Sequence, residues 1–348
     1  MNECIIRRAN ENDIAKIMAF INDHWKKDHI LAVSKDFFIY QHVWKDEVCY
    51  IIAETCNSNE IEGVLGYITY SQDQPRDLFG AIWKVRSNSY PMLGMKMQLY
   101  ALKNLDARTF SAIALNPSTL SMHARWGAYM GELKQYYMLG AHDEYKIAEI
   151  HMQPNSTYEN NIKQYTLRKV AVADDIIEVC EYEKQIGKIP IKSFEFVKHR
   201  YFDHPIYIYN NYAVIDDTAH IKGMLVTREV QYKERRVLRI LDYLGDTEAI
   251  SHLGQALQAL LNENMYEYID FYEYGLDDNL LKQAGFVLRK KNDINIIPNY
   301  FEPFVKDNID IAFYTSEKSG NVILFKGDGD QDRPNFITKM NAREELSY

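Results

Sequence analysis

Three aspartates stand at every second position in the stretch FKGDGDQDRPN, beginning with Asp328. Carboxylates at this spacing open an EF-hand calcium loop, which also needs Gly at position six and Glu at position twelve. Counting from Asp328, position six is Arg333 and position twelve is Lys339. The spacing therefore argues against calcium, and we expect the protein to hold no metal ion.

The same stretch carries basic side chains beside its acids. Lys326, Asp330 and Arg333 can form a turn that presents charges of both signs to a small-molecule ligand. The alternative is a solvated turn in which Asp330 or Asp332 pairs with Arg333. Both interpretations stay open at the level of the sequence.

A second loop, IPNYFEPF, places Asn299, Tyr300 and Glu302 between two prolines that stiffen it. An amide, a phenol and a carboxylate together can recognise a polar organic ligand by hydrogen bonding and stacking. The alternative is a structural loop that binds nothing.

Charged residues also interrupt two apolar segments. Asp242 lies within the strand-like RILDYLGD, where a buried carboxylate needs either a partner or a function. Catalysis is one interpretation, and a salt bridge to Arg239 or to a neighbouring Lys is the other. In FVKHRYFDHP, His199 or Arg200 can reach a diphosphate, or the segment is an ordinary turn that enters a strand.

The composition limits the class of protein. With 348 residues, 47% of them hydrophobic and 26% charged, the chain is typical of a globular protein of two domains. A net charge of −9 and a pI near 5.6 disfavour nucleic acid and anionic membranes as partners, but leave room for a local basic pocket. The four cysteines show no pairing or zinc spacing, and the first residues contain no apolar signal-peptide core. We therefore expect a reduced, cytoplasmic protein with small-molecule partners.

An internal repeat decides the predicted architecture. Four landmarks recur in the same order at an offset of about 160 residues. They are the strand–turn–helix patterns IIRRANENDIAKIMAFIND and TLRKVAVADDIIEVCEYEK, and the strand pairs IEGVLGYITY and IKGMLVTREV, FGAIWKV and VLRILDY, and FSAIAL and YIDFYE. We interpret the chain as an internal duplication.

Each half is predicted to run strand, helix, a middle region, three strands, helix, strand, helix, strand. This order predicts an α/β fold with a mixed sheet, antiparallel at first and parallel between the fourth and fifth strands. The polar run QPNSTYENN, residues 153–161, contains turn formers and no apolar periodicity. We therefore predict two tandem domains, at 1–152 and 162–348.

The duplicated order resembles the GNAT superfamily of acyl-CoA-dependent acyltransferases over essentially the whole chain. One family motif is a phosphate loop, Q/R-x-x-G-x-G/A, whose backbone N–H groups hold the coenzyme A pyrophosphate before a helix. The matching stretch is SNSYPMLGMKM, in which Gly94 keeps the last glycine position. The resemblance assigns Met92, Leu93 and Gly94 to coenzyme binding, although most of the motif is missing.

A second family motif, N-x6-Y-x3-G-F, follows the fifth strand. In the family its Asn contacts the coenzyme, and its Tyr can protonate the departing thiolate. The stretch NPSTLSMHARWGA keeps the spacing of Asn116 and Gly127 but has His123 at the Tyr position. The resemblance assigns coenzyme contact to Asn116 and proton donation to His123, since an imidazole titrates near neutral pH. The alternatives are a helix cap at Asn116 and a packed or surface His123.

The resemblance also implies where the thioester is held. In this family the fourth and fifth strands separate, and a backbone N–H of the fourth strand faces the thioester oxygen. The fourth strand here is AIWKV, which places the donor near Trp83, Lys84 or Val85. A carboxylate, a His or an ordered water can accept the amine proton, and Asp242 is our candidate carboxylate.

The second half keeps only QAGF, residues 283–286, and its phosphate loop falls in the acidic DYLGDTEAISHLG. Since acids repel pyrophosphate, we predict that the first half binds acyl-CoA and the degenerate second half binds the acceptor. The tail, NIIPNYFEPF with FKGDGDQDRPN, is similar to two-domain GNAT sugar N-acyltransferases of surface polysaccharide (O-antigen, lipopolysaccharide or capsule) biosynthesis.

These relatives move a 3-hydroxybutanoyl or acetyl group from coenzyme A to a dTDP-3-amino-3,6-dideoxyhexose. The resemblance implies a nucleotide-sugar site formed by His199, Arg200, Asn299, Tyr300, Glu302, Lys326, Asp330 and Arg333. Two alternatives remain open. One is transfer to another amine, such as a UDP-amino sugar, an amino acid or a peptide. The other is a non-catalytic GNAT-like binding protein, since neither half keeps the full phosphate loop.

Overall fold

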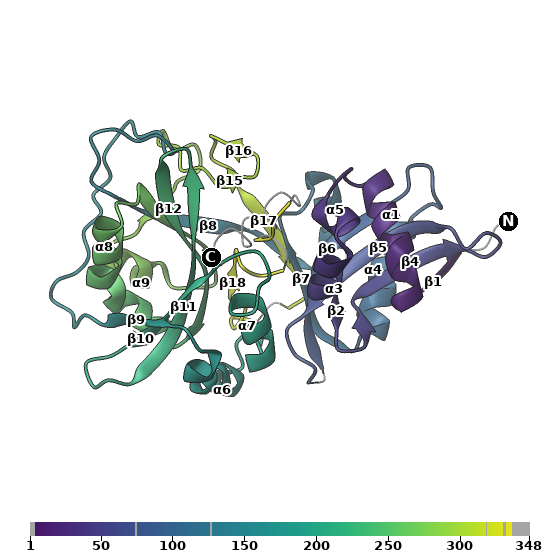
Figure 1. Cartoon of the computed structure of the whole chain (residues 1–348), viewed down its shortest axis with the longest axis horizontal. Helices are drawn as coiled ribbons and strands as arrows, with labels where there is room; N and C mark the ends of the chain where they lie inside the picture. Colours follow the sequence, from purple (N-terminus) through teal and green to yellow (C-terminus); the bar gives the residue numbers. More distant parts are fainter. Residues whose placement is uncertain (1–3, 74, 126, 318, 330–331, 336–348) are drawn as a thin grey trace, which may run out of the picture.

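The computed structural model describes residues 4–73, 75–125, 127–317, 319–329 and 332–335, and its two halves lie side by side. In Figure 1 the first half is on the right, in purple to blue, and the second is on the left, in teal and green. Strand β17 (Ile311–Thr315), drawn in yellow and belonging to the tail of the second half, lies between the two halves.

Within the described residues, the first half contains eight strands, five α-helices and one 3₁₀-helix. The strands are β1 (Cys4–Arg8), β2 (Val43–Trp44), β3 (Glu47–Val48), β4 (Tyr50–Thr55), β5 (Ile61–Thr69), β6 (Arg76–Val85), β7 (Ala107–Ile113) and β8 (Tyr129–Leu139). The helices are η1 (Glu11–Asp13), α1 (Ile14–His24), α2 (Ile30–Val33), α3 (Lys35–His42), α4 (Leu93–Asn104) and α5 (Pro117–Arg125).

The second half repeats this order with a longer tail. Its strands are β9 (Thr166–Val170), β10 (Asn210–Ile215), β11 (Ile221–Tyr232), β12 (Arg235–Gly245), β13 (Tyr268–Tyr274), β14 (Val287–Leu288), β15 (Tyr300–Phe301), β16 (Phe304–Val305), β17 (Ile311–Thr315) and β18 (Leu324–Phe325). Its helices are η2 (Ala173–Ile176), α6 (Ile177–Ile186), α7 (Phe194–Tyr201), η3 (Thr247–Leu253), α8 (Gly254–Glu263) and α9 (Asp278–Gln283).

Within the described residues, fourteen strands form one sheet. The path is β1-β4-β5-β6-β7-β17-β8-β13-β12-β11-β10-β9, with β14 beside β8 and β18 beside β13. In the first half β1, β4, β5 and β6 pair antiparallel, and β6 pairs parallel with β7. In the second half β9 to β12 pair antiparallel, and β12 pairs parallel with β13. The predicted mixed α/β sheet, repeated in each half, is confirmed.

The two halves exchange their last strands. Strand β17 pairs antiparallel with β7, with Tyr314 opposite Ala112, and with β8, with Tyr314 opposite Met130. Strand β8 in turn pairs with β13 of the second half, with Tyr136 opposite Phe271. A strand of the second half therefore completes the first, and a strand of the first half completes the second. This exchange was not predicted.

Apolar side chains at helical spacing hold α1 against the sheet. Ile14, Ile17 and Ile21 are buried, as their spacing predicts. The segment begins at a capping box, in which Asn10 and Asp13 bond to each other's backbone N–H groups. Burial of one such aliphatic side chain contributes about 1.5–3 kcal/mol. Strand β5 is buried along almost its whole length, so helices and loops cover the sheet on both faces there.

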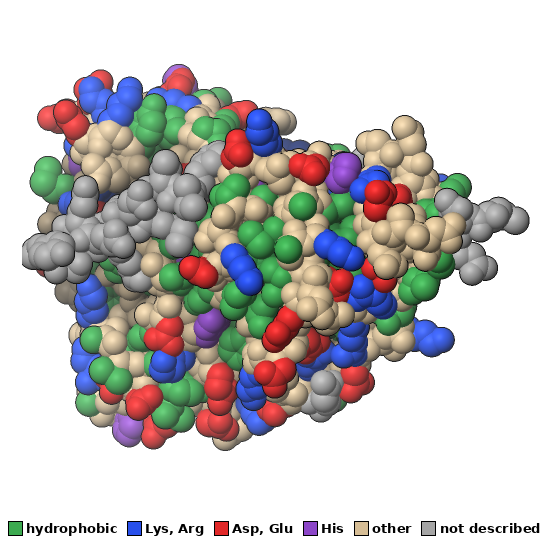
Figure 2. All heavy atoms as spheres, turned by 45° about the vertical axis from the view of Figure 1, so that its right-hand side comes forward, with side chains coloured by type: hydrophobic (Ala, Val, Ile, Leu, Met, Phe, Trp, Pro, Cys, Tyr) green, Lys and Arg blue, Asp and Glu red, His purple; other side chains and the backbone are tan. Residues whose placement is uncertain are grey.

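Figure 2 shows one face of the molecule, on which basic and acidic side chains are interspersed. This mixture is consistent with the modest net charge of −9. None of the helices in the described part of the chain is long and apolar enough to cross a membrane.

Candidate functional site

Strands β6 and β7 separate in the middle of the sheet. Their parallel pairing ends at Phe79 opposite Ser111, although β6 continues for six more residues, to Val85. On its other side, β6 pairs with β5 through a bulge: Trp83 faces Leu65 and Gly80 faces Tyr67, so Ala81 and Ile82 share one partner position. A bulge bends its strand and leaves a residue out of the ladder. The separation predicted between these strands is therefore present.

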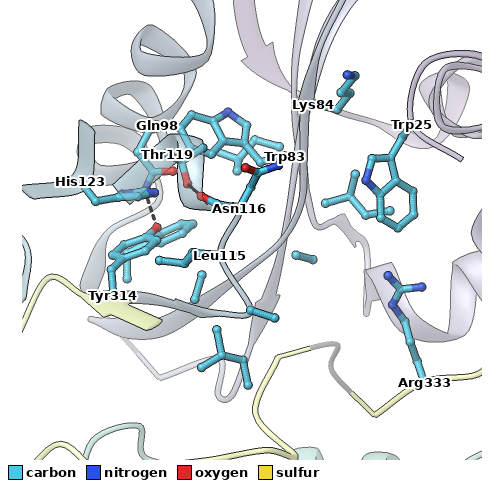
Figure 3. A pocket seen from close by; sticks show the side chains of 18 residues that line it. Trp25, Trp83, Lys84, Gln98, Leu115, Asn116, Thr119, His123, Tyr314 and Arg333 are labelled. Carbon is cyan, nitrogen blue, oxygen red and sulfur yellow. Dashed lines mark hydrogen bonds between the residues drawn. The ribbon is translucent and has the colours of Figure 1, made fainter. Parts of the chain in front are cut away.

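A cavity of about 310 Å³ fills this opening. Figure 3 shows Trp83, Gln98, His123 and Tyr314 on one side of it and Trp25 on the other. Leu65, Gly80, Phe110, Ala112 and Ile113 add an apolar lining. The cavity therefore combines an apolar interior with a few polar groups, as small-molecule sites generally do.

His123 on α5 and Tyr314 on β17 form a stacked pair in this cavity. Their ring centroids are 3.9 Å apart, and their planes differ by 18°. Burial lowers the pKa of His123 to about 4. At pH 7 roughly a thousandth of the rings carry the second proton. The predicted role of His123 as a proton donor conflicts with this environment, because a neutral imidazole is a poor acid.

Tyr314 keeps its proton. Burial raises the pKa of its phenol above the usual range, and the hydrogen bond from Gln98 opposes this only in part. The Gln98 Nε2 donates to the phenolic oxygen at 3.0 Å. The hydroxyl oxygen is thus used as an acceptor, and its O–H can donate to a group in the cavity.

Two polar atoms at the cavity have no hydrogen-bond partner among the described residues. They are Nε1 of Trp83 and Oε1 of Gln98, and both are buried. A buried polar group without a partner costs about 1–3 kcal/mol. A ligand with both a donor and an acceptor would remove this cost, so these atoms indicate a site for a polar molecule.

A second cavity, of about 520 Å³, adjoins the first through Trp83 and Thr119. It lies at the amino terminus of α4, where Met92 takes a left-handed φ of 59° and no side chain caps the helix. A Cβ on Gly94 would lie 3.2 Å from the Trp83 ring, so glycine allows close contact here. An uncapped helix start favours an anion, and Arg125 lines the same cavity.

All residues predicted for coenzyme binding line one of these two cavities. Trp83, Lys84 and Asn116 line the first, and Asn116 also directly precedes α5. Trp83, Val85, Met92, Leu93 and Gly94 line the second. The structure thus brings together residues that the sequence separates by more than thirty positions, from Trp83 to Asn116.

The equivalent opening in the second half is filled by the chain itself. Pairing of β12 with β13 ends at Ile240 opposite Phe271, and a bulge at Leu241 repeats the one in β6. Strand β18 enters this space, and the backbone N–H of Gly327 donates to the Leu241 carbonyl at 2.7 Å. A Cβ on Gly327 would lie 2.6 Å from that carbonyl oxygen, so a larger residue does not fit.

Asp242 lies inside this filled opening. Lys192 Nζ contacts both of its carboxylate oxygens, at 2.7 and 2.6 Å, and contacts Asp328 at 2.9 Å. Tyr201 donates to Asp242 at 2.6 Å, and Tyr70 donates to Asp328. Asp242, Asp328 and Lys192 have fully buried side chains. The prediction of Asp242 as a catalytic carboxylate is corrected by this ion-pair network, in which the carboxylate is closed off from any substrate.

Five of the eight residues predicted for the acceptor line a third cavity, of about 60 Å³. Asn299, Tyr300, Glu302, Lys326 and Arg333 line it. The loop between β15 and β16 and the segment after β18 therefore meet, as the acceptor-site prediction requires. Arg333 also lines the first cavity, so the two cavities share one wall.

Two bidentate ion pairs frame this third cavity. Arg228 contacts Asp332 at 3.0 Å, and Arg239 contacts Asp270 at 2.8 Å. Burial alone would raise the pKa of Asp332. The charge and the hydrogen bond of Arg228 lower this pKa by more than burial raises it, so the net pKa is well below the usual range. Asp332 is therefore ionised at neutral pH.

The remaining predicted acceptor residues lie elsewhere. His199 stacks on Tyr40, with centroids 4.2 Å apart, and burial lowers its pKa. Arg200 is buried and donates to the Asp332 carbonyl at 2.9 Å, so it supports the segment rather than lining the cavity. Asp330 is outside the described residues. Within them, no three His, Cys, Asp or Glu side chains form a metal-binding group.

Four side chains at these cavities were missed by the sequence-based prediction. Arg239 interrupts the apolar run VLRIL, a pattern that signals a buried charge with a partner or a ligand, whereas Arg228 lies between Thr227 and Glu229 and carries no such signal. Tyr314 and Gln98 carry no local signal, because the importance of each comes from strand exchange and helix packing.

No protein-family model matches the chain, and no curated protein matches its sequence. Solved structures do match. A probable N-acyltransferase from Enterococcus faecalis is 9% identical, with 90% of this chain and 72% of that chain covered and a TM-score of 0.55. A GCN5-related N-acetyltransferase from Anabaena variabilis is 11% identical, with 90% and 72% covered and a TM-score of 0.52.

Yeast (Saccharomyces cerevisiae) N-myristoyltransferase with bound myristoyl-CoA shows a looser likeness, at 14% identity, 90% and 78% covered and a TM-score of 0.46. At these identities the likeness concerns the fold. Over 90% of its length, the chain has the mixed α/β fold of the two N-acyltransferases from Enterococcus faecalis and Anabaena variabilis.

Proposed function

We propose that the protein transfers an acyl group from an acyl-CoA thioester to the amine of a small acceptor. The observation that carries the proposal is the opening between β6 and β7, where the cavity holds buried, unpartnered polar atoms of Trp83 and Gln98. An acyl-CoA offers an amide-rich arm and a thioester carbonyl, and these can bond to both atoms. Fold analogy alone would not support a function.

The donor would bind across the first two cavities. Its diphosphate would sit at the uncapped start of α4, near Arg125, and its thioester would sit between β6 and β7. The bulge at Ala81 and Ile82 supplies backbone N–H groups for the developing oxyanion. This donor is slightly earlier in β6 than the Trp83–Val85 window expected from the sequence.

Tyr314 would supply the proton for the leaving group. The amine nitrogen forms a bond to the thioester carbon and releases one proton to water, the carbon–sulfur bond breaks, and the phenol of Tyr314 protonates the thiolate and then regains a proton from water. Burial raises the pKa of the phenol and so makes it a weaker acid, but a thiolate formed in the same cavity is made more basic by the same loss of water. Gln98 and the stacked His123 fix the position of the phenol. General acid catalysis of this kind contributes about 10²–10⁴ in rate.

The acceptor would enter from the third cavity, which shares Arg333 with the first. We propose a nucleotide-linked amino sugar, specifically a dTDP-3-amino-3,6-dideoxyhexose such as the D-galactose isomer, as the acceptor and a 3-hydroxybutanoyl or acetyl group as the acyl chain. Support comes from the resemblance of the tail sequence and from the gathering of Asn299, Tyr300, Glu302 and Lys326 at this cavity. Tyr300 is an exposed aromatic ring at its mouth, and a base can stack there.

Binding of the donor is tested by thermal unfolding with acyl-CoA. A ligand at a hundred times its Kd stabilises the folded protein by about 2.7 kcal/mol. Thiol release is then followed with acetyl-CoA or 3-hydroxybutanoyl-CoA and a panel of dTDP- and UDP-amino sugars, amino acids and peptides. If no acyl-CoA raises the melting temperature, the acyltransferase proposal fails. Thiol release with UDP-sugars alone would reject the dTDP acceptor.

The proton donor is tested with two matched variants. We expect Tyr314→Phe to lower kcat by about 10²–10⁴ at an almost unchanged Kd for acyl-CoA, because only the hydroxyl is lost. His123→Phe keeps the stacked ring and removes both nitrogens, so we expect kcat within about threefold of the wild type. An equal loss in His123→Phe would return the acid role to His123 and refute the assignment to Tyr314.

A further inference from the structure

Lys326 is a buried amine with no acidic partner in the described part of the chain. Its exposed fraction is 6%, and no carboxylate of the described residues forms an ion pair with its Nζ. The amine contacts the carbonyl and the side-chain oxygen of Asn299 and lies 5.3 Å from the centre of the Tyr272 ring. It also lines the third cavity, so its open side faces the space where a ligand would bind.

Among the described residues, the charged side chains that line this cavity or pair with its lining balance one another without this amine. The groups that face it from the packed elements, three guanidinium groups and three carboxylates within the described residues, are Arg228, Arg239, Arg333, Asp270, Asp332 and Glu302. A proton on Lys326 would therefore add one uncompensated positive charge. Burial, followed by the charge of Arg239, lowers the pKa of Lys326 well below its usual range. The lowered pKa and the lack of an acidic partner among the described residues both favour the uncharged amine when no anion is bound.

The cavity has the dimensions of a small anion. Its volume of about 60 Å³ is roughly that of two water molecules in the liquid. A single phosphoryl group fits this space. Stacked cations form its wall, since Arg228 lies 4.0 Å from the centre of the Tyr207 ring and Arg239 lies 5.2 Å from that of Phe301. Within the described residues Arg228 uses Nε and Nη2 on Asp332, which leaves Nη1 as the donor that can face an anion.

We propose that this cavity is the subsite for one phosphoryl group of the acceptor, and that Lys326 takes up a proton from solvent when that group binds. The proposal rests on the proposed acyl transfer only in identifying the ligand as the acyl acceptor, because the anion site itself requires no transfer chemistry. One anionic charge balances one new ammonium, and the ammonium gains a charge-assisted hydrogen bond to a phosphate oxygen. The proton comes from the buffer, so it can be counted.

Calorimetric titration with inorganic phosphate at pH 7 measures both parts of the proposal. The full chain is titrated in two buffers of different ionisation enthalpy, in the presence of saturating coenzyme A so that the start of α4 is already occupied. Since phosphate itself exchanges protons near pH 7, we expect a heat that depends on the buffer and an uptake of close to one proton more per phosphate in the wild type than in Lys326→Met. A heat that is the same in both buffers, or no phosphate binding, would overturn the proposal.

Three variants test whether the phosphate affinity and the proton uptake come from this cavity and from Lys326. Lys326→Met should lose at least tenfold in phosphate affinity together with the proton uptake, and thermal unfolding verifies that it is folded. Arg333→Met should weaken binding but keep the proton uptake, which gives a second test if Lys326→Met does not fold. Lys291→Met removes a lysine whose side chain is 73% exposed and should behave as wild type. Unchanged phosphate affinity in Lys326→Met would refute the subsite, whatever the acyl-transfer assay shows.

Discussion

Glu273 gives the stability of the protein a defined dependence on pH. This residue on β13 is fully buried, and the backbone N–H of Leu276 donates to its Oε2 at 2.9 Å. Its Oε1 has no hydrogen-bond partner within the described residues. Burial raises the pKa of Glu273 from 4.5 to about 7, and the Leu276 hydrogen bond opposes this only in part.

The folded protein therefore binds this proton more tightly than the unfolded chain. The stabilisation is fully present below pH 4.5 and is lost as the pH rises through about 7. Glu273→Gln retains an acceptor for Leu276 and carries no charge. At about 1.36 kcal/mol per pKa unit, we expect this variant to be more stable than wild type by about 3 kcal/mol above pH 8, and by almost nothing below pH 4.5.

The assay is thermal unfolding of both proteins across this pH range. With an unfolding entropy of about 2.1 cal/mol/K per residue, 3 kcal/mol corresponds to about 4 °C in Tm for 348 residues. Glu263→Gln on the exposed surface of α8 is the control, and it should change stability by less than about 0.5 kcal/mol at every pH. If Glu273→Gln is no more stable than wild type at pH 8, Glu273 is not a buried, desolvated acid.

Two further predictions concern the paired openings of the sheet. Lys192→Met leaves Asp242 and Asp328 buried without their cation and should lower the free energy of unfolding by about 3–5 kcal/mol in urea denaturation; a loss below about 1 kcal/mol would contradict the network. Gly80→Val places methyl groups where a Cβ already lies 3.1 Å from Phe110, so it should shrink the first cavity. We expect kcat/KM for 3-hydroxybutanoyl-CoA to fall at least tenfold more than for acetyl-CoA, and equal losses would show that the acyl chain lies elsewhere.

The repeated fold could be predicted because its signals are local. Strand patterns such as IEGVLGYITY and IKGMLVTREV became β5 and β11, and the spacing of Ile14, Ile17 and Ile21 became the buried face of α1. The coenzyme-side residues gathered as expected for the same reason, since Gly94 and Asn116 each adjoin the end of a predicted strand or the start of a predicted helix. The assignment of their ligand stays a prediction.

The remaining features depend on contacts between distant parts of the chain. Asp242 is a carboxylate within an apolar strand, a pattern that indicates a buried partner. Nothing near it in the sequence identifies that partner as Lys192, fifty residues earlier. The low pKa of His123 follows from burial against Tyr314, which no spacing rule relates to it. Pairing of β17 with β7 likewise leaves no local trace, because both strands have ordinary apolar patterns.

The placement of β17 also determines when the sheet of the first half can be completed during synthesis. Ser111 and Thr315, which bond across β7 and β17, are 204 residues apart. At about 5–20 residues per second, a ribosome needs roughly 10–40 s to synthesise the missing strand after β7. During that interval β7 presents an open edge to the cell, and such edges recruit foreign strands. The sheet of the first half therefore stays incomplete until nearly the whole chain has been made, although this half is made first.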